Sequence, residues 1–492
     1  MLITNFKVLH KILFHPVEIY SLIIFRIGFG VLMFTVIYAY CTGDWIKEYF
    51  ISPKFYFKYW GFSWISPLSE VLIYFLFFIL IICTILITIG AFYRIAITLF
   101  FLGFSYLFLL DQTHYLNHFY MIILYSFLLC FMPAHHYFSV DAMRKPKIKS
   151  TFIPAWIIIL LVFQIEIILI YAGIVKINPD WLQLRPLSNW LGFKKDLFLI
   201  GSLFEKTWAV TIGAYGVIIL HILGAPLLLF KRTRVWVFII YCCFHILNSV
   251  LFDIGVFPWL TILCTSIVLS PNWPIQFYNN LIKYYDWLIS KLIWVFTIVK
   301  PSILSKSKHI KKKTKKIKFL SIKNQEITLK YTLRQKNIVI IFMSIWVLLQ
   351  IIIPNRYLLY EGDVAWTKEG SRFSWRMRLH NTFGRTEFYV HDNKTMQCFP
   401  IHNQHYLSGI QANRMSCRPD MILQFAHHLY DDWSIKQGHK DISVHSTVLC
   451  SLNFSKPALF IDPKVDLAKI ERNLKHADWI LERPLSTKKN IP

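Results

Sequence analysis

The chain has 492 residues, of which 55% are hydrophobic and 17% aromatic, and it carries a formal net charge of +26. This apolar content excludes an ordinary soluble enzyme and predicts a polytopic membrane protein. The positive charge gathers between apolar segments and comes with no base-reading motif, which argues against nucleic acid as a partner and for a lipid bilayer.

Nine apolar segments are candidate membrane spans. They lie at 19–41, 70–93, 95–110, 116–134, 153–176, 208–230, 234–252, 254–270 and 338–353. If the N-terminal lysines face inward, nine spans also place the basic clusters at 144–149, 231–234 and 300–336 on the inner side, as the positive-inside rule requires. This agreement supports the count and puts everything after residue 353 on the outer side.

The chain therefore divides into four parts. Residues 1–274 are expected to form a transmembrane helical catalytic domain. Residues 275–337 should form a cytoplasmic interfacial helix and a basic linker. The helix is expected over 275–299, along the inner surface, with Lys283 and Lys291 among Trp, Tyr and Ile, and the basic run 300–318 should lie on lipid headgroups. Residues 338–353 form the last span, and 354–492 form an extracytoplasmic domain.

The tail is different in kind. Period-two alternation at 372–378 and 387–391 predicts antiparallel strands, 419–435 reads as an amphipathic helix, and 443–452 returns to strand. The expected fold class is thus a polytopic α-helical membrane protein with a C-terminal, β-rich α+β domain that lies outside the cytoplasm.

The nine cysteines form no CxxC motif, so neither a disulfide framework nor a metal site is predicted. Cys398, Cys417 and Cys450 lie in the tail, where one pair can oxidise in an oxidising compartment, and the pairing is open. No phosphate-binding loop, HExxH motif or nucleophile elbow occurs.

The fifth apolar segment carries Gln164 and Glu166 within it and Lys176 at its outer end, before Pro179 stops the helix. Ionisable groups at this depth are costly and mark functional sites. A lysine kept from water loses affinity for its proton, and its neutral amine can act as a base. The alternative is that Lys176 snorkels its ammonium to the interface.

Polar residues of two other segments reach the same outer depth. Asn117 and His118 open the fourth segment, and His245 and Asn248 lie near the outer end of the seventh. The alternative for each histidine is a hydrogen bond to a neighbouring helix, which their convergence makes less probable.

Glu166 lies two or three turns inward of Lys176, too far for direct pairing. His221, in the sixth segment, is its candidate partner. A purely structural hydrogen bond is the stronger alternative for both of these side chains.

Several motifs in one order resemble vitamin K-dependent γ-glutamyl carboxylase, within the wider group of horizontally transferred transmembrane domain proteins. The resemblance extends from about residue 25 to 470. The matching stretches are 25–33, 109–113, 117–118, 136–141, 164–181, 245–255, 270–274, 373–377 and 461–466.

The resemblance implies an enzyme that couples oxidation of vitamin K hydroquinone by O2, to its epoxide, with carboxylation of peptidyl glutamate by CO2. Lys176 falls on the family's base and His118 on its catalytic histidine. Asn117, His245 and Asn248 are expected to line the cofactor pocket. No metal is implied, and a glutamate-containing protein or peptide would arrive from the extracytoplasmic side.

The chain also departs from the vertebrate enzymes. It lacks their terminal β-rich portion and the cysteine pair that joins the membrane part to the outer domain, so the outer domain is expected to dock by packing alone. High Ile, Lys and Phe content suggests a bacterial inner membrane with the domain in the periplasm, or on the lumenal side of the endoplasmic reticulum in a eukaryote. The alternatives are menaquinol as the quinol, an epoxidase without carboxylation, or a non-enzymatic transporter or scaffold.

Overall fold

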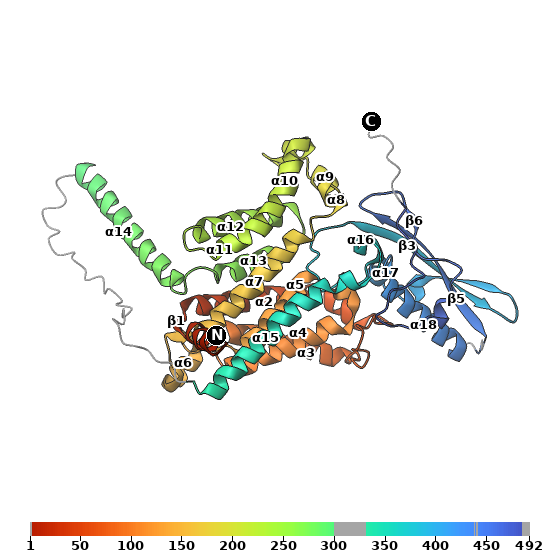
Figure 1. The fold of residues 1–492 in the computed structure, drawn as a ribbon, viewed down its shortest axis with the longest axis horizontal. Helices are drawn as coiled ribbons and strands as arrows, with labels where there is room; N and C mark the ends of the chain where they lie inside the picture. The colour runs from red at the N-terminus through yellow and green to blue at the C-terminus, as the bar shows by residue number, and fades with distance from the viewer. Residues whose placement is uncertain (1, 300–330, 437, 439–440, 485–492) are drawn as a thin grey trace.

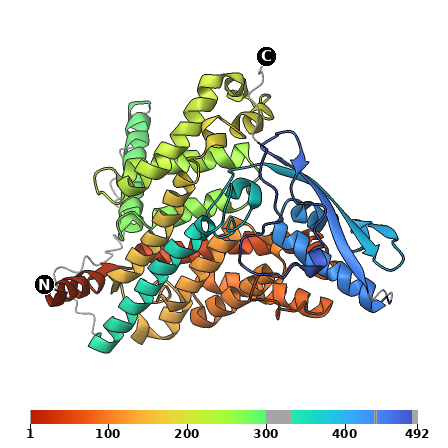
Figure 2. The ribbon, with the colours of Figure 1, turned by 45° about the vertical axis from the view of Figure 1, so that its right-hand side comes forward.

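The computed structural model describes residues 2–299 and 331–484, apart from 437, 439 and 440. A bundle of helices makes up one part, and a smaller domain built on a sheet lies at one end of the bundle, opposite the N-terminal helix α1 (Leu2–Leu13) (Figures 1 and 2). The basic linker expected after residue 299 falls largely outside the described residues.

Seven helices of the described chain are long and apolar enough to cross a membrane. They are α2 (Tyr20–Thr42), α3 (Glu70–Ile89), α4 (Tyr93–Leu110), α7 (Ala155–Ile174), the helix Thr207–Leu228 formed by α10 (Thr207–Ile219), η5 (Leu220–Gly224) and α11 (Ala225–Leu228), α12 (Arg234–Leu251), and α15 (Leu333–Asn355) with its 3₁₀ extension to Leu359. The chain is a polytopic helical membrane protein, as its hydropathy predicts.

The fourth and eighth expected spans are shorter apolar helices, α5 (Asn117–Phe131) and α13 (Phe257–Ser266). A helix rises about 1.5 Å per residue, so neither can cross about 30 Å of hydrocarbon alone. Both begin at the cavity described below, which takes up the depth that a longer helix would fill. The nine expected segments are therefore all helical, but only seven have spanning length.

Helix α7 lies at the centre of the bundle, with 67% of its most apolar window buried. It contacts α1, α10, η5, α11, α13 and α15, which explains why it is apolar on all sides. Gly173 permits the close approach of η5, since a Cβ there would lie 2.8 Å from the Cβ of His221. The helix expected over 275–299 is present as α14 (Trp273–Val299), which projects away from the bundle (Figure 1).

The outer domain carries an antiparallel sheet in the order β4-β3-β5-β6. Its elements are α16 (Val364–Thr367), β3 (Thr382–Asp392), β4 (Cys398–Ile401), α17 (Gly409–Met415), α18 (Pro419–Lys436), β5 (Ile442–Leu452) and β6 (Ala458–Leu459). Alternate residues of β3 are buried, and α18 packs against β3 and β5. The strands predicted at 387–391 and 443–452 and the helix at 419–435 are confirmed.

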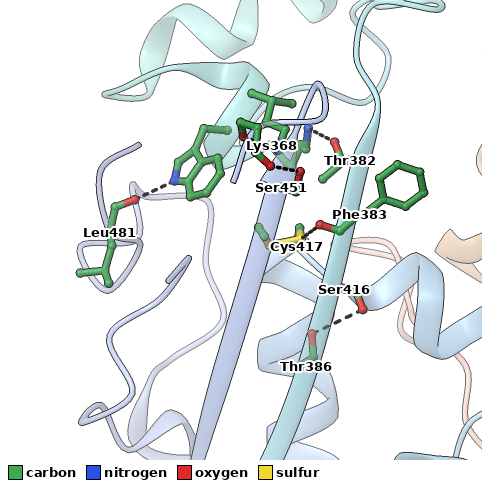
Figure 3. The surroundings of a disulfide bond; sticks show 12 residues. Lys368, Thr382, Phe383, Thr386, Ser416, Cys417, Ser451 and Leu481 are labelled. Carbon is green, nitrogen blue, oxygen red and sulfur yellow. Dashed lines mark hydrogen bonds between the residues drawn. A yellow bond between two sulfur atoms is a disulfide. The ribbon is translucent and has the colours of Figure 1, made fainter. Parts of the chain in front are cut away.

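One disulfide links Cys417, just before α18, to Cys450 on β5 (Figure 3). It resolves the open pairing, and Cys398 is left as a free, exposed thiol. The bond needs Gly384 on the neighbouring strand, because a Cβ at that position would lie 2.3 Å from the Cys417 sulfur.

The strand predicted at 372–378 is wrong, because this stretch is a loop. Phe373, Trp375 and Arg378 have φ values of 62°, 55° and 44°, which lie in the left-handed region and do not occur in strands. Trp375 is fully buried in the core of the membrane part and stacks on Tyr120 at 5.0 Å. The residues alternate because side chains of this loop, such as Trp375, are buried in the membrane part.

Docking by packing alone is also wrong, because polar bonds cross the seam between the two parts. Gln411 donates to Asp111 at 2.9 Å. Gln112 donates to Asp420 at 2.8 Å, and Asn453 donates to Asp180 at 2.7 Å. These bonds tie the outer ends of α4 and α7 to the outer domain.

Candidate active site

A cavity of about 2380 Å³ lies between the outer ends of the membrane helices and the outer domain. Its membrane-side walls are mainly apolar, with residues that include Val36, Ile168, Leu169, Leu220 and Phe244. Its opposite wall comes from the outer domain and has more basic than acidic residues. The basic ones include Lys368, Arg372, Arg376, Arg378, Arg414 and Arg418, and the acidic ones are Glu369, Asp420, Asp462, Glu471 and Asp478. Such a space can hold an apolar molecule on one side and an anion on the other.

All five residues proposed from the sequence line this cavity. They are Asn117 and His118 from the start of α5, Lys176 from the turn after α7, and His245 and Asn248 from α12. The structure therefore brings together side chains from three separate helices. The cavity joins them to a basic wall that belongs to the outer domain.

Lys176 follows the last turn of α7 and is only 6% exposed. Its Nζ donates to Ala172 O at 2.8 Å and lies 5.3 Å from the centre of the Trp181 ring. No acidic side chain of the described chain lies within 4 Å of this amine. The side chain therefore does not snorkel to water, and burial lowers the pKa of Lys176 to about 8.

Trp181, whose ring faces the Lys176 amine, is itself held in place by two hydrogen bonds. Its indole nitrogen donates to Ala214 O of α10 at 3.1 Å. Its backbone nitrogen is capped by the Asn178 side chain at 3.1 Å, an N-cap that Pro179 favours at the first helical position. The aromatic face thus offers Lys176 a cation–π contact in place of a carboxylate.

The start of α5 joins the membrane part to the basic loop. Asn117 accepts a bond from Tyr115 at 2.9 Å and donates to Arg376 O at 3.4 Å. The His118 ring packs edge-on against Phe119 and lies 6.3 Å from Phe257 at the start of α13. His118 thereby faces the cavity from a position that depends on both short helices.

The ring of His245 also lies 6.3 Å from that of Phe257. It is 2% exposed, and neither ring nitrogen has a hydrogen-bond partner among the described residues. Buried polar atoms left unpaired are costly and point to a missing partner. A hydrogen-bonding group of a ligand on the apolar side of the cavity would supply one.

The pairing of Glu166 with His221 is wrong. The His221 Nδ1 lies 3.0 Å from Val217 O, within its own helix. Both carboxyl oxygens of Glu166 are buried without a partner in the described chain, and Glu166 does not line the cavity. His221 does line it, at the membrane end.

Sequence reasoning missed the basic wall and His114. His114 is buried against Tyr49 and Phe50, with ring centres 4.7 and 4.9 Å away, and burial lowers its pKa to about 3. Arg376 was hidden by the alternation at 372–378, and Lys368 lies just before that stretch. The arginines at 372, 376 and 378 could have indicated this basic wall in the sequence, but the prediction of a strand gave them no role in a site. The described residues hold no cluster suited to a metal ion.

Two family models match this chain. The model described as HTTM domain matches residues 14–273, more than half of the chain, and the model described as vitamin K-dependent gamma-carboxylase, lumenal domain matches 335–486. The chain belongs to the vitamin K-dependent gamma-carboxylase family. In this member of the family the two matched regions meet at the cavity. No solved structure matches the chain.

Proposed function

We propose that this protein is an integral-membrane, quinol-dependent γ-glutamyl carboxylase. The observation that carries the proposal is Lys176, a buried amine that has no acidic partner among the described residues and lies in a cavity with apolar walls on one side and mainly basic residues on the other. An amine held in this way spends enough time neutral to accept a proton at physiological pH.

The apolar side of the cavity suits vitamin K hydroquinone, or menaquinol, arriving from the bilayer. His245 and His118 would bind its oxygens, with Asn248 as a further polar contact. When bound, vitamin K hydroquinone supplies, through its oxidation by O2 to the epoxide, the strong base that removes a γ-hydrogen from glutamate before CO2 adds.

The protein's own residues have three tasks. Lys176 accepts the hydroxyl proton, and its desolvation makes this possible. His118 and His245 orient the ring by hydrogen bonds that are strong in a dry site. Asn117 holds the start of α5 against the basic loop, so it positions His118 relative to the outer domain.

A glutamate-containing peptide would enter from the side of the outer domain, where the arginines attract its carboxylate. This assignment places the outer domain in the periplasm of a bacterium, or in the lumen of the endoplasmic reticulum in a eukaryote. An oxidising compartment on that side agrees with the disulfide between Cys417 and Cys450.

The test uses purified protein in detergent with reduced vitamin K, O2, labelled bicarbonate and a glutamate peptide. Epoxide and peptide-bound label are followed together in the wild type, in Lys176→Ala and in Lys195→Ala, a control at an exposed outer lysine. Both products are expected, lost only in Lys176→Ala.

Formation of the epoxide without peptide-bound label would refute the carboxylase and show that the protein is an epoxidase that does not carboxylate peptides. The absence of both products from folded protein, with menaquinol tested as well, would refute quinol chemistry. It would favour the transporter or scaffold reading.

A further inference from the structure

A second lysine, half-buried, lines the opposite wall of the same cavity. Lys368 ends α16 in a left-handed conformation, with φ of 63°. Its Nζ donates to the Thr382 hydroxyl at 2.9 Å and to Ala365 O (Figure 3). Within the described residues no carboxylate lies within 4 Å of this amine. The side chain is partly exposed, and that exposure is toward the cavity.

The charges around Lys368 are predominantly positive. Arg376, Arg418 and Arg483 disfavour its charged form and Asp363 favours it, while Glu369, the next residue, is paired with His476 at 2.8 Å. Arg483 is already paired, because it lies 3.0 Å from Asp180 and 3.4 Å from Asp363. Arg376 and Arg418 have no ion pair within the described chain. Arg376 and Arg418 line the same cavity as Lys368, and they are two guanidinium groups without an ion-pair partner among the described residues.

Burial and the neighbouring Arg418 lower the pKa of Lys368 to about 7. Roughly half of the lysine is then neutral at pH 7, against about one part in three thousand for an unperturbed lysine. His380, next to it, has a pKa well below its usual range because of burial and of Lys368 itself, so it adds no charge. A neutral amine is a nucleophile, and in this cavity it shares a wall with two guanidiniums that have no ion pair among the described residues and can hold an anion.

We propose that Lys368 binds carbon dioxide as a carbamate, held by Arg376 and Arg418. The nitrogen lone pair forms a bond to the carbon of CO2, and one C=O π pair moves onto its oxygen. One N–H proton then leaves to water in the cavity. The product is an anion, and the two guanidiniums are the counter-charges that the wall otherwise lacks.

Lys176 does not suit this chemistry although its amine is also buried. Its surroundings are Ala172 O, the Trp181 ring and apolar helix walls, and no arginine lies beside it to balance a carbamate anion. An unpaired anion in such a place is strongly disfavoured. In this proposal the two lysines have different roles, because Lys176 accepts a proton and Lys368 holds CO2.

The carbamate itself is independent of the proposed function, and its use rests on that function. Carbon dioxide held at the wall of the cavity would be released where the carboxylation consumes it. This role would raise the local concentration of a co-substrate that has no charge and few hydrogen-bonding groups of its own.

The test traps the carbamate chemically. Protein in detergent is equilibrated with ¹³CO2 at fixed partial pressure, alkylated with a trialkyloxonium salt that converts carbamates to stable esters, digested and read by mass spectrometry. We expect label on Lys368, rising as pH increases through about 7. The exposed Lys464 of the same domain serves as the internal control.

Arg376→Gln should reduce the label at Lys368, and Lys176→Ala should leave it unchanged. Label at Lys368 that is no greater than at Lys464 would overturn the proposal, and the wild-type protein alone suffices for this result. Loss of quinol oxidation with the label intact would refute only the proposed function. Intact oxidation without label would refute only the carbamate.

Discussion

Replacing Lys176 by Met should make the protein more stable and inactive. The difference between the ordinary lysine pKa of 10.5 and about 8 corresponds to about 3 kcal/mol. Because the folded pKa is lowered, this cost is fully present below pH 8, where the charged amine stays buried, and it is relieved as pH rises toward 10.5. Losing the hydrogen bond from Lys176 to Ala172 O costs about 1 kcal/mol, so the net increase in the free energy of unfolding at pH 7 is about 2 kcal/mol.

The assay is the thermal unfolding midpoint, followed by tryptophan fluorescence in detergent at pH 7 and at pH 10. The midpoint of Lys176→Met should exceed that of the wild type at pH 7. The advantage should disappear at pH 10, where the cost of the buried amine falls below about 1 kcal/mol. Lys195→Met, at an exposed position, is the control and should change little.

A midpoint that falls at pH 7, or a gain that is the same at both pH values, would refute the account of Lys176 as a desolvated amine. Loss of quinol oxidation together with a gain in stability would show that the enzyme sacrifices stability at this residue for function.

Three further results are expected. Quinol oxidation should increase with pH through about 8, as the Lys176 amine becomes neutral, and a flat profile would contradict its role. Replacing Cys417 and Cys450 by Ser should cost about 3–4 kcal/mol, from a separation of 33 residues, and lower the midpoint of the outer domain; an unchanged midpoint would count against the bond. Gly173→Ala should lower the midpoint and the activity, because its Cβ meets η5 at 2.8 Å, whereas Gly213→Ala, with nothing within 4 Å, should not; equal behaviour of both would refute this packing.

The membrane part could be predicted because its signals are local. An apolar run of about 20 residues must be a helix in lipid, where every backbone group needs a partner within the same segment. Lys176 and His118 stood out for the same reason, since a polar group in such a run is costly. The lengths of α5 and α13 were not predictable, because they depend on a cavity formed by other helices.

The part of the outer domain that lines the cavity was harder to predict. Alternation at 372–378 is a valid strand signal, but here it arises because Trp375 packs on Tyr120, which is 255 residues earlier in the chain. The alternation by itself does not distinguish a strand from a loop whose side chains are buried by a distant part of the chain. The polar seam was missed for a similar reason, because Asp111 and Gln411 each look like ordinary surface residues until the fold brings them to 2.9 Å.

The two lysines of the cavity explain why the site needs both domains. Lys176 is made less basic mainly by apolar burial at the end of a membrane helix. Lys368 is made less basic by burial and by arginines that only the outer domain supplies. The apolar walls of the cavity come from the membrane helices, and Arg372, Arg376, Arg414 and Arg418 come from the outer domain. Under the proposed function, the cavity between the two domains combines a desolvated base with a wall that attracts anions.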